Sequence, residues 1–387
     1  MRITEILADT LSTGPTIVRV VSDEGIVGLS ELGWQDPAIF WAHLDRVIRP
    51  QLIGQDPLQP GRLWERLVAG TPELPYPTTT SFAGVIDIAL WDLLGKAAGL
   101  PIHALLGGAA RTEISLYWSV GAGFAKTPDQ MVSDVLRGRD QGFGAFKIRM
   151  DWGPLRPDVD PAKDLEMARQ VRAAVGEETW LGFDANRGYT VGTAIRQGRV
   201  LEELGIAHFE EPISEHDMAG LAEVCRALDV PVSTGEQLRD RWAFRDLIEL
   251  ANPDILQPDI LDAGGISEVV RIFQLAEVHA KPAMPHSPAA GILSVASMHA
   301  YATLPGGVQP HEYSVEYGPA PERIAELFVE PVLPEGGTFR LSDRPGLGLT
   351  LDQRVFDDMQ RNIPNVVSDG DVLSFLIIEQ IGFALEN

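Results

Sequence analysis

Five polar residues recur at nearly constant spacing through the middle of the chain. Each one closes a short apolar run and follows the previous one by 23 to 27 residues: Asp184, Glu210, Glu236, Asp259 and His286. That spacing matches one strand, one helix and two short loops. In a barrel of parallel strands, the carboxyl ends of all strands open at one shared mouth. The sequence therefore predicts an α/β fold, a barrel that gathers these five side chains at its mouth.

Candidate strands and helices alternate through this region. The helices are indicated by an N-cap followed by proline at Asp160-Pro161, and by glycine stops at Gly176 and Gly205. Strands that alternate with helices imply a parallel sheet, and about eight such units imply closure into a barrel. The candidate strands are residues 114–120, 145–150, 180–184, 206–210, 231–236, 254–259, 281–286 and 308–313.

The two ends of the chain depart from this repeat. Residues 1–32 predict three short strands, and residues 37–107 predict helices, so together they form an α+β domain. After a Gly- and Pro-rich stretch, the last segment is expected to return to that domain. We therefore divide the chain into an N-terminal α+β domain (1–112), a barrel (113–347) and a returning C-terminal segment (348–387).

Charge and composition exclude several classes of protein. A formal net charge of -24 opposes binding to nucleic acid and to anionic membranes. The sequence has no apolar stretch long enough for a membrane span and no signal-peptide layout at its start. The single cysteine, Cys225, excludes an internal disulfide and suits a reducing compartment. It lies in an apolar helical stretch, so we expect a buried side chain and not a nucleophile. We expect a cytoplasmic protein.

Three of the five recurring residues form a candidate metal site. Asp184, Glu210 and Glu236 offer only oxygen ligands, which suit Mg²⁺ or Mn²⁺ better than zinc. A buried carboxylate without a partner is costly, and one divalent cation would resolve all three together. Glu211 should point the opposite way from Glu210, toward an ion pair behind the barrel.

His286 follows Asp259 by one strand-helix unit, which places an imidazole beside a carboxylate on adjacent strands. A carboxylate that holds one ring nitrogen fixes the tautomer and leaves the other nitrogen free to act as a base. The remaining histidines considered lack such a setting and are interpreted as structural: His103, His208, His216 and His299.

Positive charge at the mouth comes from the second barrel strand. Lys147 and Arg149 are two residues apart, so both should face the mouth and could bind a substrate carboxylate. Glu312 lies near the end of the eighth candidate strand, so it should also face the barrel mouth. Asn186, two residues beyond Asp184, could donate a hydrogen bond to a substrate hydroxyl.

The chain resembles the enolase superfamily, mandelate racemase subgroup, over nearly its whole length. The motifs that carry the resemblance are FKIRM, FDAN, FEEP, STGEQ, QPD and MPH in this order, together with the helix ALWDLLGKAAGLP. The resemblance implies a modified (β/α)7β barrel under a capping domain built from both chain ends. It also implies Mg²⁺ on Asp184, Glu210 and Glu236, and a catalytic pair of His286 and Asp259. Members abstract the proton α to a carboxylate, and the family pairs a Lys or His base with Mg²⁺.

The resemblance also assigns roles to Lys147 and Glu312. Positive charge from Mg²⁺ and Lys147 would stabilise the intermediate that forms when the α-proton leaves. Glu312 stands where the family places an acid against the substrate carboxylate, so we expect it to be protonated there.

Two departures from the family pattern shape the functional hypothesis. Arg149 stands where the racemase has lysine, and arginine stays protonated. His286 is then the one good base, which favours β-elimination of water over a two-base racemisation. In addition, the connection between the first two strands is short, so a lid over the substrate would come from residues 72–81 or 151–159. The additional candidate substrate contacts are Trp34, Tyr76, Trp152 and Arg156.

We therefore expect a Mg²⁺-dependent dehydratase of a sugar acid, an aldonate or aldarate, that gives a 2-keto-3-deoxy product. The first alternative is a racemase or epimerase of a 2-substituted carboxylate, and a remote one is a sugar-acid-binding protein without activity. Cycloisomerisation in the muconate manner is less favoured, because the lysine of that subgroup is Asp259 here. Relatives are commonly symmetric, often octameric, so a homo-oligomer is expected by analogy.

Overall fold

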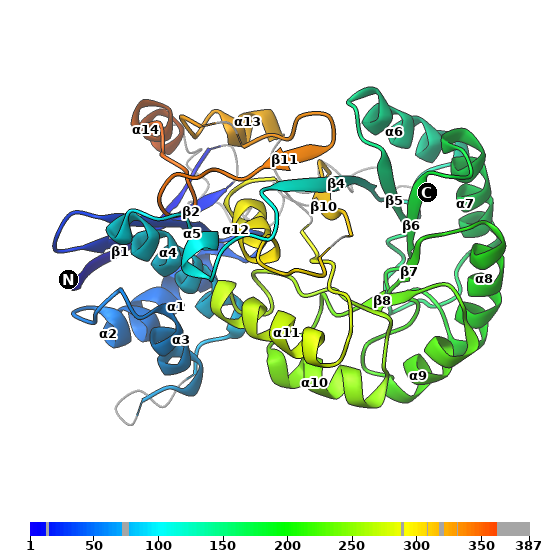
Figure 1. Ribbon diagram of the computed structural model, residues 1–387, viewed down its shortest axis with the longest axis horizontal. Coiled ribbons are helices and arrows are strands. Elements are labelled where there is room, and N and C mark those ends of the chain that lie inside the picture. Colours follow the sequence, from blue (N-terminus) through cyan, green and yellow to red (C-terminus); the bar gives the residue numbers. More distant parts are fainter. Residues whose placement is uncertain are drawn as a thin grey trace, which may run out of the picture.

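The computed structural model describes residues 1–12, 15–71, 77–287, 290–307, 309–316, 321–330 and 332–361. It has a smaller α+β part and a larger α/β barrel (Figure 1). The smaller part starts with an antiparallel sheet in the order β1-β2-β3, as the sequence predicted. Its strands are β1 (Ile3–Thr10), β2 (Thr16–Ser22) and β3 (Val27–Glu31).

Helices follow this sheet through residue 105. The long helix α4 packs across β3, and its ends carry clear signals. The Thr79 side chain accepts a hydrogen bond from the Phe82 N–H at its start, and Gly99 adopts a left-handed φ of 70° at its end. The elements are α1 (Pro37–His43), the π-helix η1 (Leu44–Ile48), α2 (Arg49–Leu52), α3 (Pro60–Ala69), α4 (Thr80–Ala98) and α5 (Ile102–Leu105).

The barrel strands are parallel and lie in the order β10-β4-β5-β6-β7-β8-β9. Arg149, Asp184 and Glu210 share one level of this sheet, because they are paired in register across β5, β6 and β7. The strands are β4 (Glu113–Val120), β5 (Ala145–Arg149), β6 (Trp180–Asp184), β7 (His208–Glu210), β8 (Val232–Thr234), β9 (Ile255–Leu256) and β10 (His311–Ser314). A short strand, β11 (Thr338–Arg340), pairs antiparallel with β4.

The later strands are shorter than predicted. Residues 281–286 form isolated parallel bridges, Leu256 with Ala283 and Asp259 with His286, in place of a continuous strand. Pro282 and Pro285 lack backbone N–H groups, so this segment cannot complete a regular ladder. At β8, Gly235 has a φ of 130° and ends the extended backbone, which leaves Glu236 beyond the strand end.

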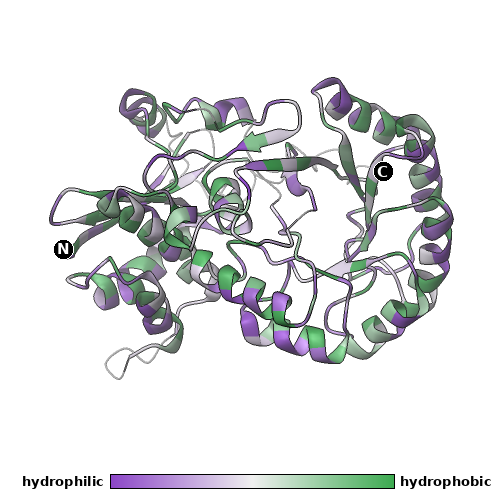
Figure 2. Cartoon of the chain, in the orientation of Figure 1, coloured by the Kyte–Doolittle hydropathy of each residue, from purple (hydrophilic) through white to green (hydrophobic). Residues whose placement is uncertain are grey.

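Helices form an outer ring around these strands (Figure 1). Their buried residues face the sheet, and Figure 2 shows both hydrophobic and hydrophilic positions along each of them. The barrel helices are α6 (Pro128–Asp140), α7 (Pro161–Val175), α8 (Val191–Glu203), α9 (Met218–Ala227), α10 (Arg241–Leu250), α11 (Ile266–Val278) and α12 (Ile292–Tyr301).

The chain returns to the N-terminal sheet after the barrel. Helices α13 (Pro321–Ala325) and α14 (Gln353–Arg361) lie in this part. The Gln360 side chain donates to the Asp9 carboxylate at 2.6 Å, and the Arg19 guanidinium lies 5.1 Å from the Phe356 ring centre. The fold is therefore a modified barrel with a capping domain, to which the described part of the returning segment, up to residue 361, also belongs. The rest of that predicted segment, 362–387, lies outside the described residues, and the domain boundaries after residues 112 and 347 stay predictions.

A search of the described helices finds none with the length and apolarity needed to cross a bilayer.

The contact between β3 and α4 gives a stability test. A Cβ atom at Gly28 would overlap the carbonyl oxygen of Ala89 and lie 2.8 Å from the Leu93 Cβ. We expect Gly28→Ala to destabilise the protein by about 1–3 kcal/mol through overpacking, measured by urea denaturation. Gly144→Ala is the control, because a Cβ there meets open space. Equal stability of the two variants would contradict the close packing of α4 on β3.

Candidate functional site

The three acidic residues at successive strand ends converge as predicted. Asp184 ends β6, Glu210 ends β7, and Glu236 lies two residues beyond β8. All three are buried, and one carboxylate oxygen of each lies within 4.8 Å of those of the other two. Burial together with neighbouring Glu210 raises the pKa of Asp184 well above its ordinary value, and burial raises the pKa of Glu236. The cluster is therefore short of positive charge.

Lys147 reaches this cluster from β5, where its side chain is fully buried. Its Nζ lies 2.6 Å from Glu210 Oε1, 3.0 Å from Glu312 Oε1 and 3.9 Å from Asp184 Oδ2. Burial disfavours a charged ammonium, but Glu210 and Glu312 hold the pKa of Lys147 well above its ordinary value. Burial alone would raise the pKa of Glu210, and Lys147 keeps it below its ordinary value. One ammonium thus lies within 3.9 Å of three buried carboxylates.

Asn186 is engaged within the protein. Its Nδ2 donates to Asp184 Oδ2 at 3.0 Å, its backbone N–H donates to Asp184 Oδ1 at 2.7 Å, and its Oδ1 accepts from the Asp151 N–H at 2.8 Å. The residue has a left-handed φ of 48°, which the sequence did not reveal. These contacts orient the Asp184 carboxylate, and the predicted contact with a substrate hydroxyl stays a prediction.

The imidazole of His286 and the carboxylate of Asp259 are paired, with Nδ1 2.8 Å from Oδ2. The other oxygen of Asp259 accepts from the backbone N–H groups of Leu261 and Asp262, each at 2.8 Å. His286 Nε2 therefore faces the acidic cluster, 3.5 Å from Glu236 Oε2 and 3.9 Å from Glu312 Oε2. Burial alone would lower the pKa of His286, but Glu236, Glu312 and Asp259 raise it to about 10.

The expectation that Glu312 is protonated is wrong for this arrangement. Burial does act to raise its pKa, but Lys147, His286 and Arg149 outweigh that effect and hold the pKa of Glu312 well below its ordinary value. Glu312 Oε2 also accepts a hydrogen bond from the Ser287 N–H at 3.0 Å. Glu312 is accordingly an anion that binds Lys147, and the sequence pattern could not show how close these cations come.

Arg149 is buried at the end of β5, where it has an acidic partner that the sequence did not indicate. Its Nη2 lies 2.8 Å from Glu316 Oε2, and the other oxygen of Glu316 lies 2.8 Å from Lys126 Nζ. Glu316 also accepts from the Gly121 N–H. Glu316 follows β10 in a loop without a recognisable motif, so no signal in the sequence marked it.

The four candidates for further substrate contacts are in different situations. Trp34 comes from the capping domain, is 51% exposed, and its ring meets that of His286 edge-on at 6.4 Å between centroids. Trp152 is instead held by a hydrogen bond from its Nε1 to Asp164 at 3.0 Å. Arg156 is exposed in the loop after β5. Tyr76 lies outside the described residues, as do residues 72–75 of the predicted lid segment 72–81. Their roles stay predictions.

The prediction for Glu211 needs correction. Its φ of 38° breaks the strand alternation, so the residue does not simply point away from Glu210. Its carboxylate is buried 3.5 Å from the Nε of Arg187, which follows β6 at the barrel mouth and not behind the barrel. Burial and the negative charges of Glu236 and Asp184 raise the pKa of Glu211 well above its ordinary value.

The remaining histidines and the cysteine are consistent with structural positions. Burial lowers the pKa of His208 to about 4, and its Nδ1 lies 2.7 Å from the Ser233 hydroxyl. His103 and His299 stack with 5.3 Å between ring centroids, and His216 is exposed. Cys225 is only partly buried, in contrast to the predicted buried side chain. Desolvation still raises the pKa of its thiol to about 12, which argues against a nucleophile.

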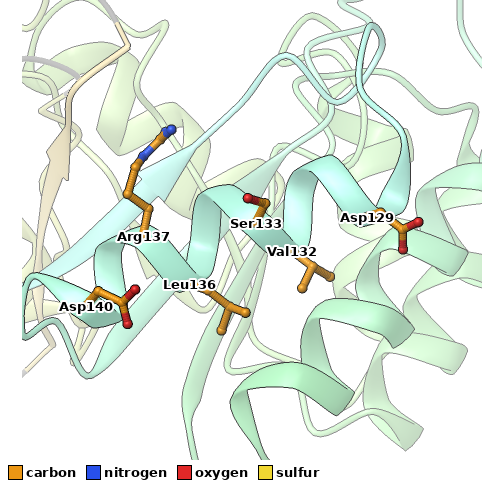
Figure 3. A pocket seen from close by; sticks show the side chains of 6 residues that line it. All are labelled: Asp129, Val132, Ser133, Leu136, Arg137 and Asp140. Carbon is orange, nitrogen blue, oxygen red and sulfur yellow. The ribbon is translucent and has the colours of Figure 1, made fainter.

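A surface hollow of about 480 Å³ lies away from this cluster. All six residues that line it belong to the single helix α6, among them Asp129, Arg137 and Asp140 (Figure 3). None of the acidic residues at the barrel mouth lines this hollow. We therefore take the convergent side chains at the barrel mouth, and not the hollow, as the candidate site.

The pairing around His286 gives a test by titration. The negative charge of Glu236 is one of the main effects that raise the pKa of His286. We expect Glu236→Gln to lower that pKa by at least about 1, measured by nitrogen NMR of labelled histidine in metal-free buffer. Glu215→Gln is the control, because Glu215 contacts Arg187 and His216. An unchanged His286 titration in Glu236→Gln would contradict the described contact.

Comparisons with known proteins agree with this fold. The enolase C-terminal domain-like family matches residues 130–355, and the N-terminal domain of mandelate racemase/muconate lactonizing enzyme matches residues 5–107. A solved structure of a mandelate racemase/muconate lactonizing protein from Paracoccus denitrificans, complexed with magnesium, is 36% identical. It matches with a TM-score of 0.85 over 92% of this chain and 98% of that chain.

Characterised relatives include sugar-acid enzymes. An arabinonate dehydratase of Saccharolobus solfataricus is 30% identical over 88% of this chain and 89% of its own length. An L-talarate/galactarate dehydratase of Salmonella typhimurium is 34% identical over 81% and 74%. A D-galactarolactone cycloisomerase of Agrobacterium fabrum is 32% identical over 90% and 92%. From its family matches, its fold and these relatives, the chain belongs to the enolase superfamily, in the mandelate racemase subgroup.

Proposed function

We propose that this protein is a Mg²⁺-dependent dehydratase that converts a sugar acid, an aldonate or aldarate, into a 2-keto-3-deoxy acid. The observation that supports this most is the Asp259–His286 pair, whose Nε2 faces the cluster of Asp184, Glu210 and Glu236. The names of the arabinonate and L-talarate/galactarate dehydratases support the substrate class.

The acidic cluster fits Mg²⁺ in number and kind of donor. Asp184, Glu210 and Glu236 supply oxygens alone, and these oxygens lie within 4.8 Å of one another. The raised pKa values of Asp184 and Glu236 show that the cluster needs more positive charge than Lys147 gives. When bound, Mg²⁺ would supply charge that stabilises a substrate carboxylate as it gains electron density. Mn²⁺ takes similar donors and remains the alternative cation.

His286 is the proposed base. Asp259 accepts the Nδ1–H, which fixes the tautomer with Nε2 free to take a proton. The pKa of about 10 means that the imidazole is protonated while the charge of Glu236 is uncompensated. When Glu236 binds a cation, its negative charge is offset and the pKa of His286 falls. The neutral Nε2 can then remove the proton at Cα.

Lys147 is the proposed donor to the substrate carboxylate. Its pKa lies well above the ordinary value, so it stays an ammonium and can stabilise an anion. Glu312, ionised and 3.0 Å from Nζ, orients the ammonium. The predicted role of Glu312 as a proton donor to the substrate is replaced by this positioning role.

The elimination needs only one acid-base group. His286 Nε2 takes the Cα proton, and the electron pair of that bond moves toward the substrate carboxylate, where Lys147 stabilises the negative charge. The pair then returns to form the double bond between Cα and Cβ as the β-hydroxyl leaves. The imidazolium then gives its proton to the leaving oxygen, which departs as water. The resulting enol takes up a proton from solvent at Cβ and loses the proton of its 2-hydroxyl to solvent, which gives the 2-keto acid and leaves the histidine in its starting state.

Racemisation lacks a second base in this arrangement. A base on the face opposite His286 would have to come from β5, where Lys147 stays protonated and Arg149 cannot lose its proton. Arg149 is also paired with Glu316 at 2.8 Å. These observations favour dehydration over a two-base racemase or epimerase.

Cycloisomerisation is the second candidate, because one relative is a D-galactarolactone cycloisomerase at 32% identity. A lactone of a sugar acid carries the same α-proton, so a single base could begin either reaction. Position 259 is aspartate and not lysine, which argues against cycloisomerisation by the muconate mechanism. It does not argue against a cycloisomerisation that uses His286 as the base.

The predicted assembly and location are also part of this proposal. We infer a cytoplasmic homo-oligomer that acts on a small carboxylate, by analogy with relatives of the same fold. Gel filtration with light scattering tests the oligomer directly.

A screen of sugar acids and their lactones tests the proposed reaction. With Mg²⁺ present, we expect one aldonate or aldarate to yield a 2-keto acid, detected as its semicarbazone, with one deuterium incorporated at Cβ in D₂O. Deuterium exchange at Cα without loss of water would support the epimerase instead. Consumption of a lactone alone would support cycloisomerisation, and ligand binding without turnover would support a binding protein.

The assignment of His286 as base gives a second prediction. His286→Asn keeps the size of the side chain but removes the basic nitrogen, so kcat should fall by at least about 10²-fold. Calorimetry should show nearly unchanged Mg²⁺ affinity. His216→Asn, at an exposed histidine, is the control and should keep wild-type kcat. Wild-type turnover in His286→Asn would remove this pair from the mechanism.

A further inference from the structure

The barrel helices differ in how their N-termini are capped. Four helices use a side chain of their own N-cap residue, which accepts a backbone N–H of the first turn: α6, α7, α9 and α10. Helices α11 and α12 begin instead at Gly265 and Gly291, which have no side chain to offer. These are the two helices that follow Asp259 and His286 in the chain.

The capping domain supplies the missing acceptor for α11. Asp87, on α4, accepts from the Ser267 N–H at 2.8 Å and from the Ser267 hydroxyl at 2.6 Å. A Cβ at Gly265 would lie 2.7 Å from Asp87 Oδ2, so only glycine admits the carboxylate there. The aspartate thus takes the place of an N-cap residue, although it belongs to another domain.

A second residue of the capping domain does the same for α12. Glu31, the last residue of β3, accepts from the backbone N–H groups of Ile292 and Leu293, the latter at 3.2 Å. A Cβ at Gly291 would lie 2.9 Å from both of its carboxylate oxygens. The two helices lie on the side of the barrel nearest the capping domain (Figure 1).

Further contacts join α4 and α12 to the segments that carry Asp259 and His286. Beyond Asp87, helix α4 also holds the loop after β9, since Ser81 donates to Asp262 Oδ1 at 2.7 Å. The Asp262 N–H in turn donates to Asp259 at 2.8 Å. Beyond Glu31, Ser294 in the first turn of α12 bonds the hydroxyl of Ser287, next to His286, at 2.7 Å.

Burial of Glu31 and Asp87 is energetically unfavourable for their ionised forms. Burial raises the pKa of Glu31 and of Asp87 to about 7, so each is unfavourable as an anion unless its contacts compensate.

The metal-binding candidates Asp184 and Glu236 are followed by α8 and α10, and α10 is capped by its own Asp240. Helix α8 has no side-chain cap of its own, but its N-cap residue Thr190 donates its N–H to Asp158 of the barrel at 2.9 Å. Among these helices, only α11 and α12 are therefore described with a capping-domain carboxylate at the N-terminus.

We propose that Glu31 and Asp87 are positioning residues for the His286–Asp259 pair, acting by capping the two helices that follow it. The capping domain then sets the geometry of proton transfer as well as covering the mouth. This inference rests on the proposed role of His286 as base, and it makes the docking of the two domains part of the catalytic geometry.

The test compares loss and restoration of the acceptor. Asp87→Ala and Glu31→Ala remove it, while Asp87→Asn and Glu31→Gln keep one oxygen that can accept the helix N–H. We expect the alanine variants to lower kcat by about tenfold, with KM and Mg²⁺ affinity within about twofold, and the amide variants to recover most of kcat. A ring misplaced by a small distance slows proton transfer without changing ground-state binding.

The matched control is Asp92→Ala. Asp92 is a buried carboxylate of the same helix α4, and it accepts from the N–H groups of Leu29 and Leu347, each at 2.8 Å, away from the catalytic pair. Its loss should lower Tm but leave kcat nearly unchanged below the transition. If Asp87→Ala does not fold, Glu31→Ala carries the same test at α12, because it removes the acceptor of the Leu293 N–H.

A second readout does not need turnover. The His286 Nδ1–H bonded to Asp259 should give a downfield proton NMR signal, identified by its loss in His286→Asn. We expect this signal to shift or broaden in Asp87→Ala and Glu31→Ala but not in Asp92→Ala. Wild-type kcat and an unchanged signal in both alanine variants would overturn the inference. A perturbed signal in a protein that dehydrates no sugar acid would retain the positioning and reject the proposed reaction.

Discussion

The site depends on an excess of buried negative charge at the barrel mouth. Asp184, Glu210, Glu236 and Glu312 converge there, and Lys147 alone reaches three of them. Buried carboxylates at such short separations repel each other and lack solvation, which is why the pKa of Asp184 rises so far. A divalent cation is the simplest compensation. It would also lower the pKa of His286, so the same charge that completes the cluster would make the base available.

The capping domain contributes more to this site than a cover. Trp34 brings an exposed ring against His286, and Glu31 and Asp87 accept hydrogen bonds from the helices that follow His286 and Asp259. The metal-binding candidates are positioned differently, by strand register and by local contacts such as those of Asn186.

Periodicity predicted the barrel, the order of its units and the residues at their ends, because strand-helix repeats force strand ends to one mouth. It predicted less where the backbone departs from regular geometry. The strand at 281–286 is reduced to bridges by two prolines, and the left-handed φ of Glu211 places its side chain near Arg187 at the mouth. The ionisation of Glu312 depends on distances to Lys147 and His286 that spacing does not encode. Glu316, Glu31 and Asp87 act from loops or from another domain, so no local pattern marked them.

The central claim is that Asp184, Glu210 and Glu236 hold one divalent cation beside His286. Anomalous diffraction from crystals grown with Mn²⁺ tests it most directly, because manganese replaces Mg²⁺ at oxygen-donor sites and can be located on its own. The claim predicts one strong peak per chain, within bonding distance of an oxygen of all three carboxylates. A peak bound by other residues, or none at this cluster under saturating Mn²⁺, would contradict it.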